Sequence, residues 1–484
     1  MAVLAAPTFQ LQPSAQQVAL SSNYITNTQF NFLNQYLPDT YEKEFERYGN
    51  RTVSSFLRMV GAEMPSNSDL IKWAEQGRLH IKYVNCVLGG AAAGAAAETF
   101  TVPAAQIDPA RQPSGSVAPA GAAGQIGIRK GQTVMISDDT AGSALNNKGI
   151  VTAVTATTFT VNFYEAAGLA AYAGTASVFI YGSEFKKGVN GMEGGLISND
   201  FIFENSPIIL KDKYQVSGSD MAQIGWIEIQ TEDGANGYLW YLKSEHETRL
   251  RFDDYLETAM VEAVPAEAGS GVATQAVYAD AGNKGSEGVF YVVEARGNVW
   301  GAGNPTDLAG FDSIISRLDK QGSIEENVIF VNRNFSFDID DMLAAQNSYG
   351  AGGSSYGLFD NDEEMALNLG FTGFRRGYDF YKSDWKYLND PTMRGGLIGG
   401  AINGLLVPAG STTVYDQILG KNAKRPFLHV RYRASETEDR RYKSWITGSA
   451  GGASNKDLDA MEVNFLSERC VCTLGANNFF LFKS

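Results

Sequence analysis

Residues 237–263, GYLWYLKSEHETRLRFDDYLETAMVEA, constrain the fold of this chain more than any other stretch, because they contain no Pro and no Gly beyond the first residue. Apolar side chains recur here at three- and four-residue spacing, typical of one face of a helix: Phe252, Tyr255, Leu256, Ala259 and Met260. Glu247 and Arg251 stand four residues apart in the order that stabilises a helix. A helix of this length approaches about 40 Å and spans a whole domain.

The composition indicates a globular protein with a surface poor in charge. The chain has 484 residues, of which 44% are apolar and 19% charged, against roughly 25% charged in common soluble domains. This length predicts about two to four domains with cores of their own. A low charge content is typical of the core of a protein–protein interface. The net charge of −15 argues against nucleic-acid binding, which requires a basic surface.

The N-terminal residues 1–35 are rich in Gln, Asn, Ser and Ala and contain no charged residue. They lack the apolar spacing of a segment that folds alone, so we expect an extended arm that becomes ordered on another surface. No basic region precedes an apolar one, which argues against a signal peptide. No stretch is long and apolar enough to cross a bilayer. We therefore expect a soluble protein made in a cytoplasm, without a membrane partner.

The next segment changes character twice. Residues 36–86 are predicted to be mainly helical, with helices near 38–59 and 68–76. Residues 89–125 are a low-complexity run of Ala, Gly and Pro, typical of a flexible stretch. Short β-branched runs separated by turns follow at 133–136, 150–154, 158–163 and 177–181. Because helical material stops before this region and resumes after it, we interpret residues 87–185 as an inserted small all-β domain.

Residues 186–230 are predicted to contain a long hairpin. The segments FIFENSPIILKDKYQVSGSD (201–220) and IGWIEIQ (224–230) have the character of strands. The middle of this hairpin is polar and its ends have no obvious cover. A hairpin without a core of its own is unstable alone and requires a partner.

The second half of the chain mixes strands and helices. Residues 231–287 hold the long helix, and residues 288–440 are predicted to form an α+β domain. Its expected elements are strands at 289–294 and 328–331, helices at 307–318, 340–346 and 362–369, and aromatic-rich segments at 371–388 and 427–433. Residues 441–484 are expected to add strands at 458–467 and 468–474 and to join a sheet against the long helix.

The tip that follows strand 328–331 is a place where α/β enzymes often hold ligands. The residues there are Asn332, Arg333 and Asn334, and neither a nucleophile nor a general base stands beside them. We interpret the acids that follow as the cap and first turn of a helix beginning at Asp338: Asp338, Asp340 and Asp341. We expect no chemistry at this tip.

Other candidate sites fail on spacing. The acidic run at 359–365 lacks the glycine of a calcium loop and fits a helix cap. The glycines of 295–305 match neither a phosphate loop nor a dinucleotide fingerprint, so this segment is predicted to be a turn. The three His and three Cys residues have no zinc spacing, and the thiols are expected to be buried and reduced. Cofactors, metals and catalysis are therefore not expected, although a Ser-His-Asp site with distant members stays open.

The run RYRASETEDRRYKSW, residues 431–445, is the most strongly charged segment. Three interpretations remain: a solvated loop, a belt of ion pairs between subunits, and a phosphate site, which the interleaved acids disfavour. We predict that the following residues contact neighbouring subunits: Lys211, Asp212, Lys213, Glu247, Arg251, Arg431, Arg433, Arg440 and Arg441.

The chain thus combines an arm, a hairpin without a core, a long helix, an α+β lobe and terminal strands, and each element without a partner of its own requires a neighbouring copy. This order of elements resembles the HK97-type major capsid protein of tailed bacteriophages (Caudoviricetes). The likeness lies in the arm at 1–35, the hairpin at 186–230, the helix at 237–263, segments such as ENVIFVNRNFSFDIDDML, and the ending DLDAMEVNFLSERCVCTLGANNFFLFK. The length, insertion and non-basic arm are similar to those of crAss-like phages. The inserted domain departs from the minimal pattern of the family.

The resemblance implies an HK97-like α+β fold with an N-terminal arm, an extended E-loop, a peripheral (P) domain built on the long helix, and an axial (A) domain. It also implies a virion protein, assembled in the bacterial cytoplasm, that forms pentamers and hexamers of an icosahedral capsid. Such a capsid encloses double-stranded DNA without sequence-specific binding, with portal, scaffold or decoration proteins as further partners. The alternatives are an encapsulin-like nanocompartment shell protein and an α/β hydrolase-type enzyme with residues 87–185 as a binding module.

Overall fold

The computed structural model describes residues 62–78, 80–107, 126–172, 174–192, 200–222, 229–230, 236–237, 240–274, 283–347, 372–416, 421–452 and 454–483. The arm at 1–35 and the helices expected near 38–59 and at 362–369 lie outside these residues. The chain divides into two compact units. The smaller combines the end of one long strand, the start of the long helix and the turn of a C-terminal hairpin, and the larger holds most of the other described elements.

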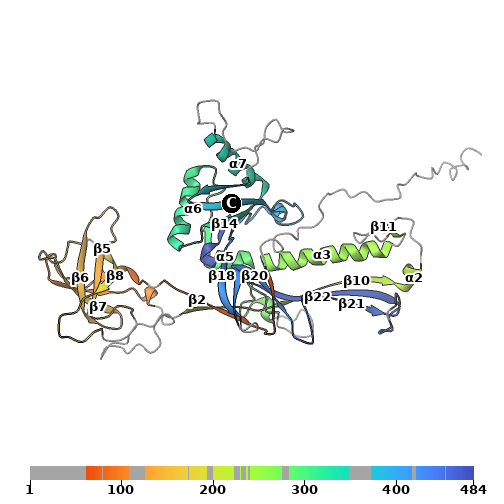
Figure 1. The fold of residues 1–484 in the computed structure, drawn as a ribbon, viewed down its shortest axis with the longest axis horizontal. Coiled ribbons are helices and arrows are strands. Elements are labelled where there is room, and N and C mark those ends of the chain that lie inside the picture. Colours follow the sequence, from red (N-terminus) through yellow and green to blue (C-terminus); the bar gives the residue numbers. More distant parts are fainter. Residues whose placement is uncertain are drawn as a thin grey trace, which may run out of the picture. The chain divides into compact units, whose positions relative to one another are not determined.

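A five-stranded sheet accompanies the long helix (Figure 1). Its strands run in the order β1 (Ala62–Ser66), β20 (Leu428–Arg433), β22 (Ala460–Thr473) and β10 (Ile208–Ser217), with β21 (Lys443–Gly448) paired to β22. The predicted long helix is confirmed as α3 (Trp240–Glu262). Phe252 packs on Tyr442 and Phe465 with ring centroids 5.4 and 5.8 Å apart. Tyr255, expected on the same apolar face, is instead exposed.

Two strands form a ribbon by themselves. β2 (Ile71–Gln76) pairs antiparallel with β9 (Asp200–Asn205), with Ile71 opposite Asn205 and Gln76 opposite Asp200. The helix expected near 68–76 is therefore wrong. The alternation of apolar and polar residues in IKWAEQ has a period of two, and the partner that selects a strand lies more than 100 residues away along the chain.

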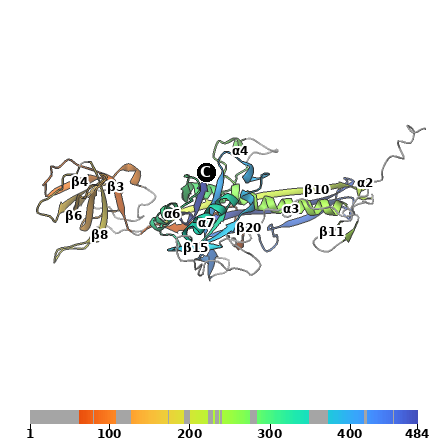
Figure 2. The ribbon, with the colours of Figure 1, turned by 90° about the horizontal axis from the view of Figure 1, so that it is seen from above.

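The chain between β2 and β9 forms a closed six-stranded barrel (Figure 2). Its strands follow one another in the order β3 (Lys82–Leu88), β4 (Ala97–Thr101), β7 (Thr158–Phe163), β6 (Asn146–Val154), β5 (Gln132–Asp138) and β8 (Thr175–Ser183). A core of inward-facing side chains fills it, among them Phe100, Val134, Phe159 and Val178. The inserted all-β domain is thus confirmed as a barrel, although β4 and the short helix η3 (Ala104–Gln106) replace part of the stretch expected to be flexible.

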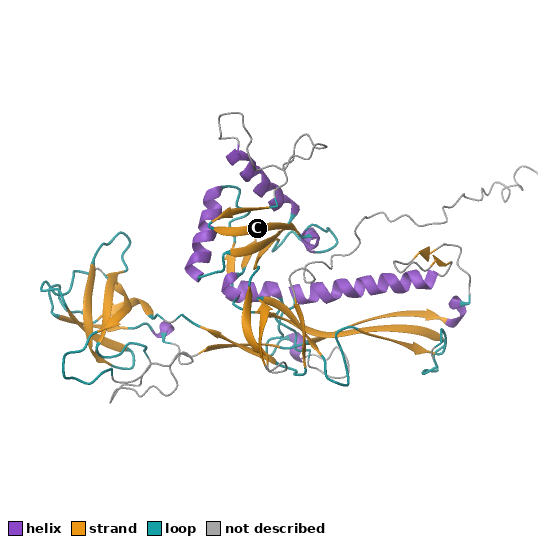
Figure 3. Ribbon diagram, in the orientation of Figure 1, coloured by secondary structure: helices purple, strands orange, loops and turns teal. Residues whose placement is uncertain are grey.

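A six-stranded sheet organises the α+β lobe (Figure 3). Its order is β13 (Asn298–Trp300), β23 (Phe480–Lys483), β17 (Ile402–Pro408), β14 (Glu326–Val331), β16 (Tyr378–Asp384) and β15 (Gly373–Arg376). Helices α6 (Leu308–Gln321) and α7 (Arg333–Asn347) cover one face, where they pack on Ile329, Leu406 and Phe480. The predicted α6 is confirmed: Asp307 accepts a hydrogen bond from Gly310 N at 2.8 Å, and Gly322 ends the helix at a φ of 68°.

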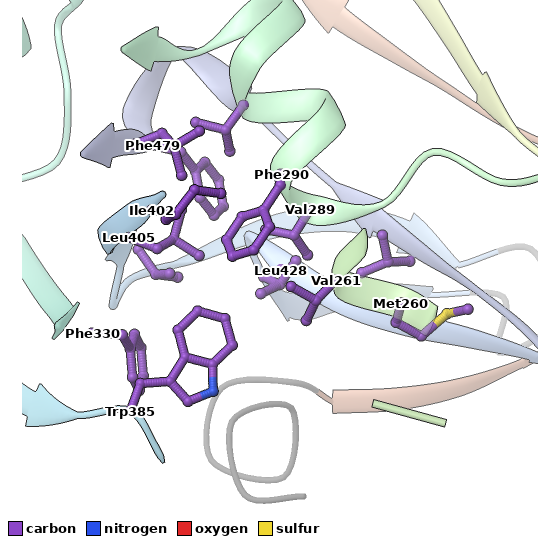
Figure 4. Close-up of a cluster of buried hydrophobic side chains, with 14 of the residues drawn as sticks. Met260, Val261, Val289, Phe290, Phe330, Trp385, Ile402, Leu405, Leu428 and Phe479 are labelled. Atoms are coloured by element: carbon purple, nitrogen blue, oxygen red, sulfur yellow. The ribbon is translucent and has the colours of Figure 1, made fainter. Parts of the chain in front are cut away.

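The opposite face of this sheet meets α5 (Val289–Arg296) and α3 in the main hydrophobic core (Figure 4). Phe290 points toward Trp385, with ring centroids 5.8 Å apart. The segment 289–294 was expected to be a strand, and that expectation is wrong. Val289, Phe290, Val292 and Val293 are all buried, and a continuous apolar run has no periodicity that separates a buried helix from a buried strand.

The hairpin expected within 186–230 does not form among the described residues. β9 pairs with β2, whereas β10 is an edge strand beside β22. Of the segment 224–230, the described Ile229–Gln230 (β11) pairs with Asn236–Gly237 (β12). A strand-like sequence pattern indicates that the backbone needs a hydrogen-bonding partner. Which strand becomes that partner is decided by tertiary packing.

The C-terminal tail also differs from its expectation. The two strands expected at 458–467 and 468–474 are one 14-residue strand, β22. After β22 the chain passes from the sheet that accompanies α3 into the lobe, where β23 pairs with β13 and β17. The described residues also form α2 (Gly218–Met221), α4 (Gly271–Thr274), the paired strands β18 (Ser411–Asp416) and β19 (Lys421–Pro426), and the short 3-10 helices η5 (Lys386–Leu388), η6 (Arg394–Gly396) and η7 (Ala476–Asn478).

Candidate functional site

The β2–β9 ribbon presents two different faces. Trp73 and Phe203 lie side by side on one face, with ring centroids 6.3 Å apart. On the other face, Ile202 has 70% of its surface exposed. Among the described residues, neither β2 nor β9 pairs with a third strand. Both edges of this ribbon thus offer unpaired backbone donors and acceptors, which is the usual requirement for pairing with another chain.

Arg296 holds the aromatic face of the ribbon. Its guanidinium carbon lies 4.1 Å from the Phe203 ring centroid, a cation–π contact. The same guanidinium donates to Glu287 Oε2 at 2.8 Å. Burial raises the pKa of Glu287, and the charge of Arg296 opposes that rise. Glu75 adds a second attachment, since its Oε1 accepts from Trp73 Nε1 and from Gly475 N, both at 2.9 Å.

Asn205 fixes the end of β9. Its buried amide donates to Glu287 O at 3.0 Å and to Val471 O at 2.7 Å. Its Oδ1 accepts from Ser286 Oγ and from Glu287 N, both at 2.9 Å. Both ends of this amide are therefore satisfied, so the base of the ribbon is rigidly attached to β22 and to the segment before α5.

A cluster of ion pairs ties β1 to β22. Glu63 on β1 pairs with Arg441 and, at 3.3 Å, with Arg469. Arg469 is buried, and its guanidinium also donates to Arg441 O at 2.9 Å and to Ser467 Oγ at 2.9 Å. Burial lowers the pKa of Arg469, and the charge of Glu63 opposes this change. A buried guanidinium needs such a partner, because an unpaired charge is costly in the interior.

Glu468 is the second centre of this cluster. It pairs with Arg440 at 2.6 Å and with Arg433 at 3.4 Å, and Arg433 also pairs with Asp69. The predicted contact residues Arg433, Arg440 and Arg441 thus all lie in one place. Their acidic partners come from β1, β22 and the segment after β1. Within the run 431–445 itself, Glu438 pairs with Lys443 at 2.6 Å.

The other predicted contact residues lie on three elements. Arg251 on α3 makes a two-pronged contact with Asp212 on β10, at 2.9 and 3.1 Å. Lys211 and Lys213 project from β10 on the exposed side, opposite to Asp212. Arg431 lies on β20 with its Nη1 3.9 Å from Met64 Sδ, and Glu247 is half-buried on α3. The contact of these residues with another subunit stays a prediction.

The three thiols are buried. Cys470 and Cys472 lie on the same side of β22, and Cys472 faces His429 in the register. A hydrogen bond with Cys472, together with burial, raises the pKa of Cys470. Cys86 lies in the barrel core, where burial raises its pKa to about 12. Hydrogen bonds with Cys470 and His429 lower the pKa of Cys472, so its burial, rather than a neutral state, keeps this sulfur from acting as a nucleophile.

The polar tip after β14 has a structural role. Asn332 Oδ1 accepts from Phe335 N at 2.8 Å and so caps α7. The helix therefore begins at Arg333, five residues before the expected start at Asp338. Asp340 pairs instead with Lys382 at 2.5 Å, and Asp338 accepts from Asn304 at 2.6 Å. The cap was missed because Asn332 closes a strand and begins a helix without an intervening loop.

Residues 295–305 are only partly a turn. Asn298–Trp300 form β13, which pairs in parallel with the C-terminal strand β23. The acidic run at 359–365 lies outside the described residues. In the part of the chain that the structure describes, no three His, Cys, Asp or Glu side chains gather closely enough for a metal ion. No helix of the same part has the length and apolar character needed to cross a membrane.

Sequence reasoning missed Asn205, Glu468, Arg469 and the outward-facing side chains of the barrel. Asn205 stands in a polar FENSP context that is typical of a turn. Glu468 and Arg469 interrupt an apolar run, and this is the signal that could have marked them as a buried, paired set. The outward barrel residues follow from strand register, which requires the pairing partners.

Comparison with known proteins gives remote structural matches. No protein-family model and no curated protein matches the chain. A chain from Microbacterium phage Oxtober96 aligns with 10% identity over 95% of this chain and 99% of that chain, with a TM-score of 0.38. A chain titled "Asymmetric unit of bacteriophage PhiM1 mature capsid" aligns with 8% identity over 98% of each chain and a TM-score of 0.37. A Mycobacterium phage Bobi chain aligns with 8% identity over 95% and 98%, with a TM-score of 0.35. Because these scores lie below 0.5, we base the functional proposal on the chain's own geometry.

Proposed function

We propose that this chain is a structural protein, the major capsid protein of a tailed bacteriophage. In this proposal, identical copies associate into pentamers and hexamers of an icosahedral head that encloses double-stranded DNA. The subunit has no catalytic task, and its function is to hold neighbours together.

The β2–β9 ribbon is the observation that carries the proposal. It has two open edges among the described residues and an Ile202 side chain that is 70% exposed. A two-stranded ribbon is at best marginally stable alone. Its base, however, is rigidly attached through Asn205, Glu75 and Arg296. A firmly anchored ribbon with unsatisfied edges is suited to lie on another subunit.

The elements divide among the roles of a shell subunit. We assign residues 1–35 to an arm and α3 with the five-stranded sheet to a peripheral domain. The α+β lobe within 288–440, with β23 added, is assigned to an axial domain. The extended loop comprises β2, the barrel and β9, in place of the hairpin expected at 186–230.

The charge of the chain fits a container for DNA. A net charge of −15 provides no basic field for binding phosphates, so the packaged DNA would be confined rather than bound. Arm, ribbon and ion-pair cluster give each subunit several contacts. Several modest contacts act together, so that disassembly becomes slow. The predicted contact residues on β10, α3 and β20 are proposed to serve such contacts.

Sedimentation and negative-stain microscopy of the purified full-length chain test the proposal directly. We expect closed particles, or pentamers and hexamers that close into particles at higher concentration. A well-behaved monomer or small oligomer at all concentrations would contradict it. Open sheets or fibres would contradict the icosahedral geometry while leaving self-assembly intact.

A further inference from the structure

The barrel differs from the rest of the chain in charge. Residues 82–183 contain five Lys and Arg residues and five Asp and Glu residues. The entire net charge of −15 therefore resides outside the barrel. Two copies of the acidic remainder repel one another. The barrel, like the uncharged residues 1–35, can therefore approach an acidic copy without this repulsion.

One side of the barrel carries apolar side chains that the core does not use. Along β8, Val178 points inward, whereas Phe179 and Tyr181 point outward with 41% and 50% of their surfaces exposed. Val84 on β3 is likewise exposed at 37%, and Met135 on β5 is half-buried. Aromatic residues and Met are enriched, and charges depleted, in the cores of protein interfaces.

Strand register places a lysine on each side of this apolar centre. Phe179 stands opposite Lys82 on β3 and opposite Met135 on β5. Met135 in turn stands opposite Lys148 on β6. The order across four neighbouring strands is therefore Lys82, Phe179, Met135, Lys148, and both lysines are exposed. We name the six residues Lys82, Val84, Met135, Lys148, Phe179 and Tyr181 the β8 face.

We propose that the β8 face is a docking site for an acidic surface of a second copy of this chain, outside that copy's barrel. This inference rests on the proposed self-assembly and names the partner of one module within it. An apolar centre flanked by Lys82 and Lys148 is complementary to an acidic surface with apolar residues. The nearby acids Asp139 and Glu165 are engaged within the barrel, where they accept hydrogen bonds from Ser177 Oγ and Lys148 N. The chain itself supplies such a partner, because its charge outside the barrel is strongly negative.

The occupant can be identified by cross-linking with a zero-length carbodiimide, which joins a lysine amine to a carboxylate that it touches. Particles are assembled from an equal mixture of ¹⁴N- and ¹⁵N-labelled full-length chains. We expect Lys82 or Lys148 to be linked to an Asp or Glu residue outside 82–183, in peptide pairs of mixed isotope. Links confined to pairs of a single isotope, or no link from either lysine, would overturn the proposal.

Charge reversal tests the energetic contribution of the face. The double variant Lys82→Glu, Lys148→Glu should speed particle disassembly by about tenfold or more at low salt, with a smaller effect at high salt. Lys130→Glu is the matched control, because Lys130 is an exposed barrel lysine outside the β8 face. It should change the rate by less than about twofold. Equal effects of the two variants would refute a specific face.

A variant that leaves the charge unchanged tests the apolar centre of the face separately. Phe179→Ser alters an outward side chain that is 41% exposed, so the barrel core stays intact. It should also speed disassembly by about tenfold, and here independently of salt. If wild-type chains form no particles, both the proposed function and this face are wrong. If wild-type chains form particles, and neither Phe179→Ser nor the lysine reversal changes the rate of disassembly, only the assignment of the β8 face is wrong.

Discussion

Asn205, Asn332 and Arg469 place polar side chains at points where segments distant in sequence meet. Asn205 joins β9 to β22, Asn332 joins the end of β14 to Asn403 on β17, and Arg469 joins β22 to β1. Each side chain is satisfied by partners that no local pattern reveals. Such groups stabilise only one arrangement of the chain, because any other arrangement leaves them unpaired.

The buried thiols lead to a prediction on reactivity and pH. None of the three cysteines should react with Ellman's reagent in the folded chain at neutral pH, and all three should react in denaturant. Burial raises the pKa of Cys86 from 9.0 to about 12. Its neutral form therefore contributes stability that is complete below pH 9.0 and is lost as the pH rises toward about 12. The variant Cys86→Ala should lack this part of the alkaline decline, as measured by urea unfolding at several pH values. Rapid labelling of the native chain would contradict the assignment.

The ion pair of Glu63 with buried Arg469 should be worth more than an exposed one. Glu63→Gln removes the countercharge of Arg469, at a cost of about 2 kcal/mol. Amide exchange in β1 and β20 should accelerate by about 30-fold as a result. The control is Glu204→Gln, which breaks the Lys72–Glu204 pair, 2.9 Å long and 56% exposed at both side chains. It should cost less than about 0.5 kcal/mol. A larger effect of Glu204→Gln would invert this ranking.

At the scale of elements, the strands that join distant segments decide the architecture. β2 and β9 pair across the whole barrel, and β23 crosses from the end of the chain into the lobe. α3 and α6 are local elements, and the sequence predicted their ends to within three residues. α5 and β14 are both short apolar runs in the sequence, yet one is a helix and the other a strand. β14 has hydrogen-bonding partners on both sides, β16 and β17. α5 instead packs its side chains against one face of the same sheet.

The barrel depends on close packing where β6 pairs with β7. A Cβ at Gly149 would lie 2.3 Å from Val161 Cγ1 and 2.5 Å from Asn162 O. Gly149→Ala should therefore destabilise the barrel by about 1–3 kcal/mol. Gly174→Ala is the control, since a Cβ there meets no atom within 4 Å. Hydrogen exchange of barrel peptides in the full-length chain measures both. If amide hydrogens of the barrel exchange equally slowly in the two variants, the contact of Gly149 with β7 is not as close as stated here.

At the scale of the whole molecule, one core connects α3, α5, the lobe sheet and the five-stranded sheet. Val261, Phe290, Leu405, Leu428 and Val471 all belong to it. The ribbon carries no comparable core, because Ile202 faces outward and the ribbon has only two strands. Under the proposed function, the ribbon is attached at its base and its outward face stays free for contacts with other copies.

Removal of residues 1–35 tests the role of the arm under the proposed function. The truncated chain should stay folded, because the main core of the described part of the chain is built from buried residues between 260 and 481. It should fail to form closed particles, because one set of contacts between copies is lost and avidity falls steeply with each lost contact. Sedimentation measures assembly, and circular dichroism verifies the fold. Normal particles from the truncated chain would show that the arm does not clamp its neighbours.

The local features could be predicted from the sequence: the long helix α3, the helix α6, the strand β14, and an inserted β domain bounded by changes in composition. These features follow from periodicity and capping, which act within a few turns of the chain. Tertiary partners make β2 a strand paired with β9 and make α5 a helix. They also pair Glu468 with Arg433 and Arg440, and Arg469 with Glu63 on β1. Those outcomes depend on backbone and charge partners separated by more than a hundred residues in most cases, and a partner at that distance leaves no local periodicity to read.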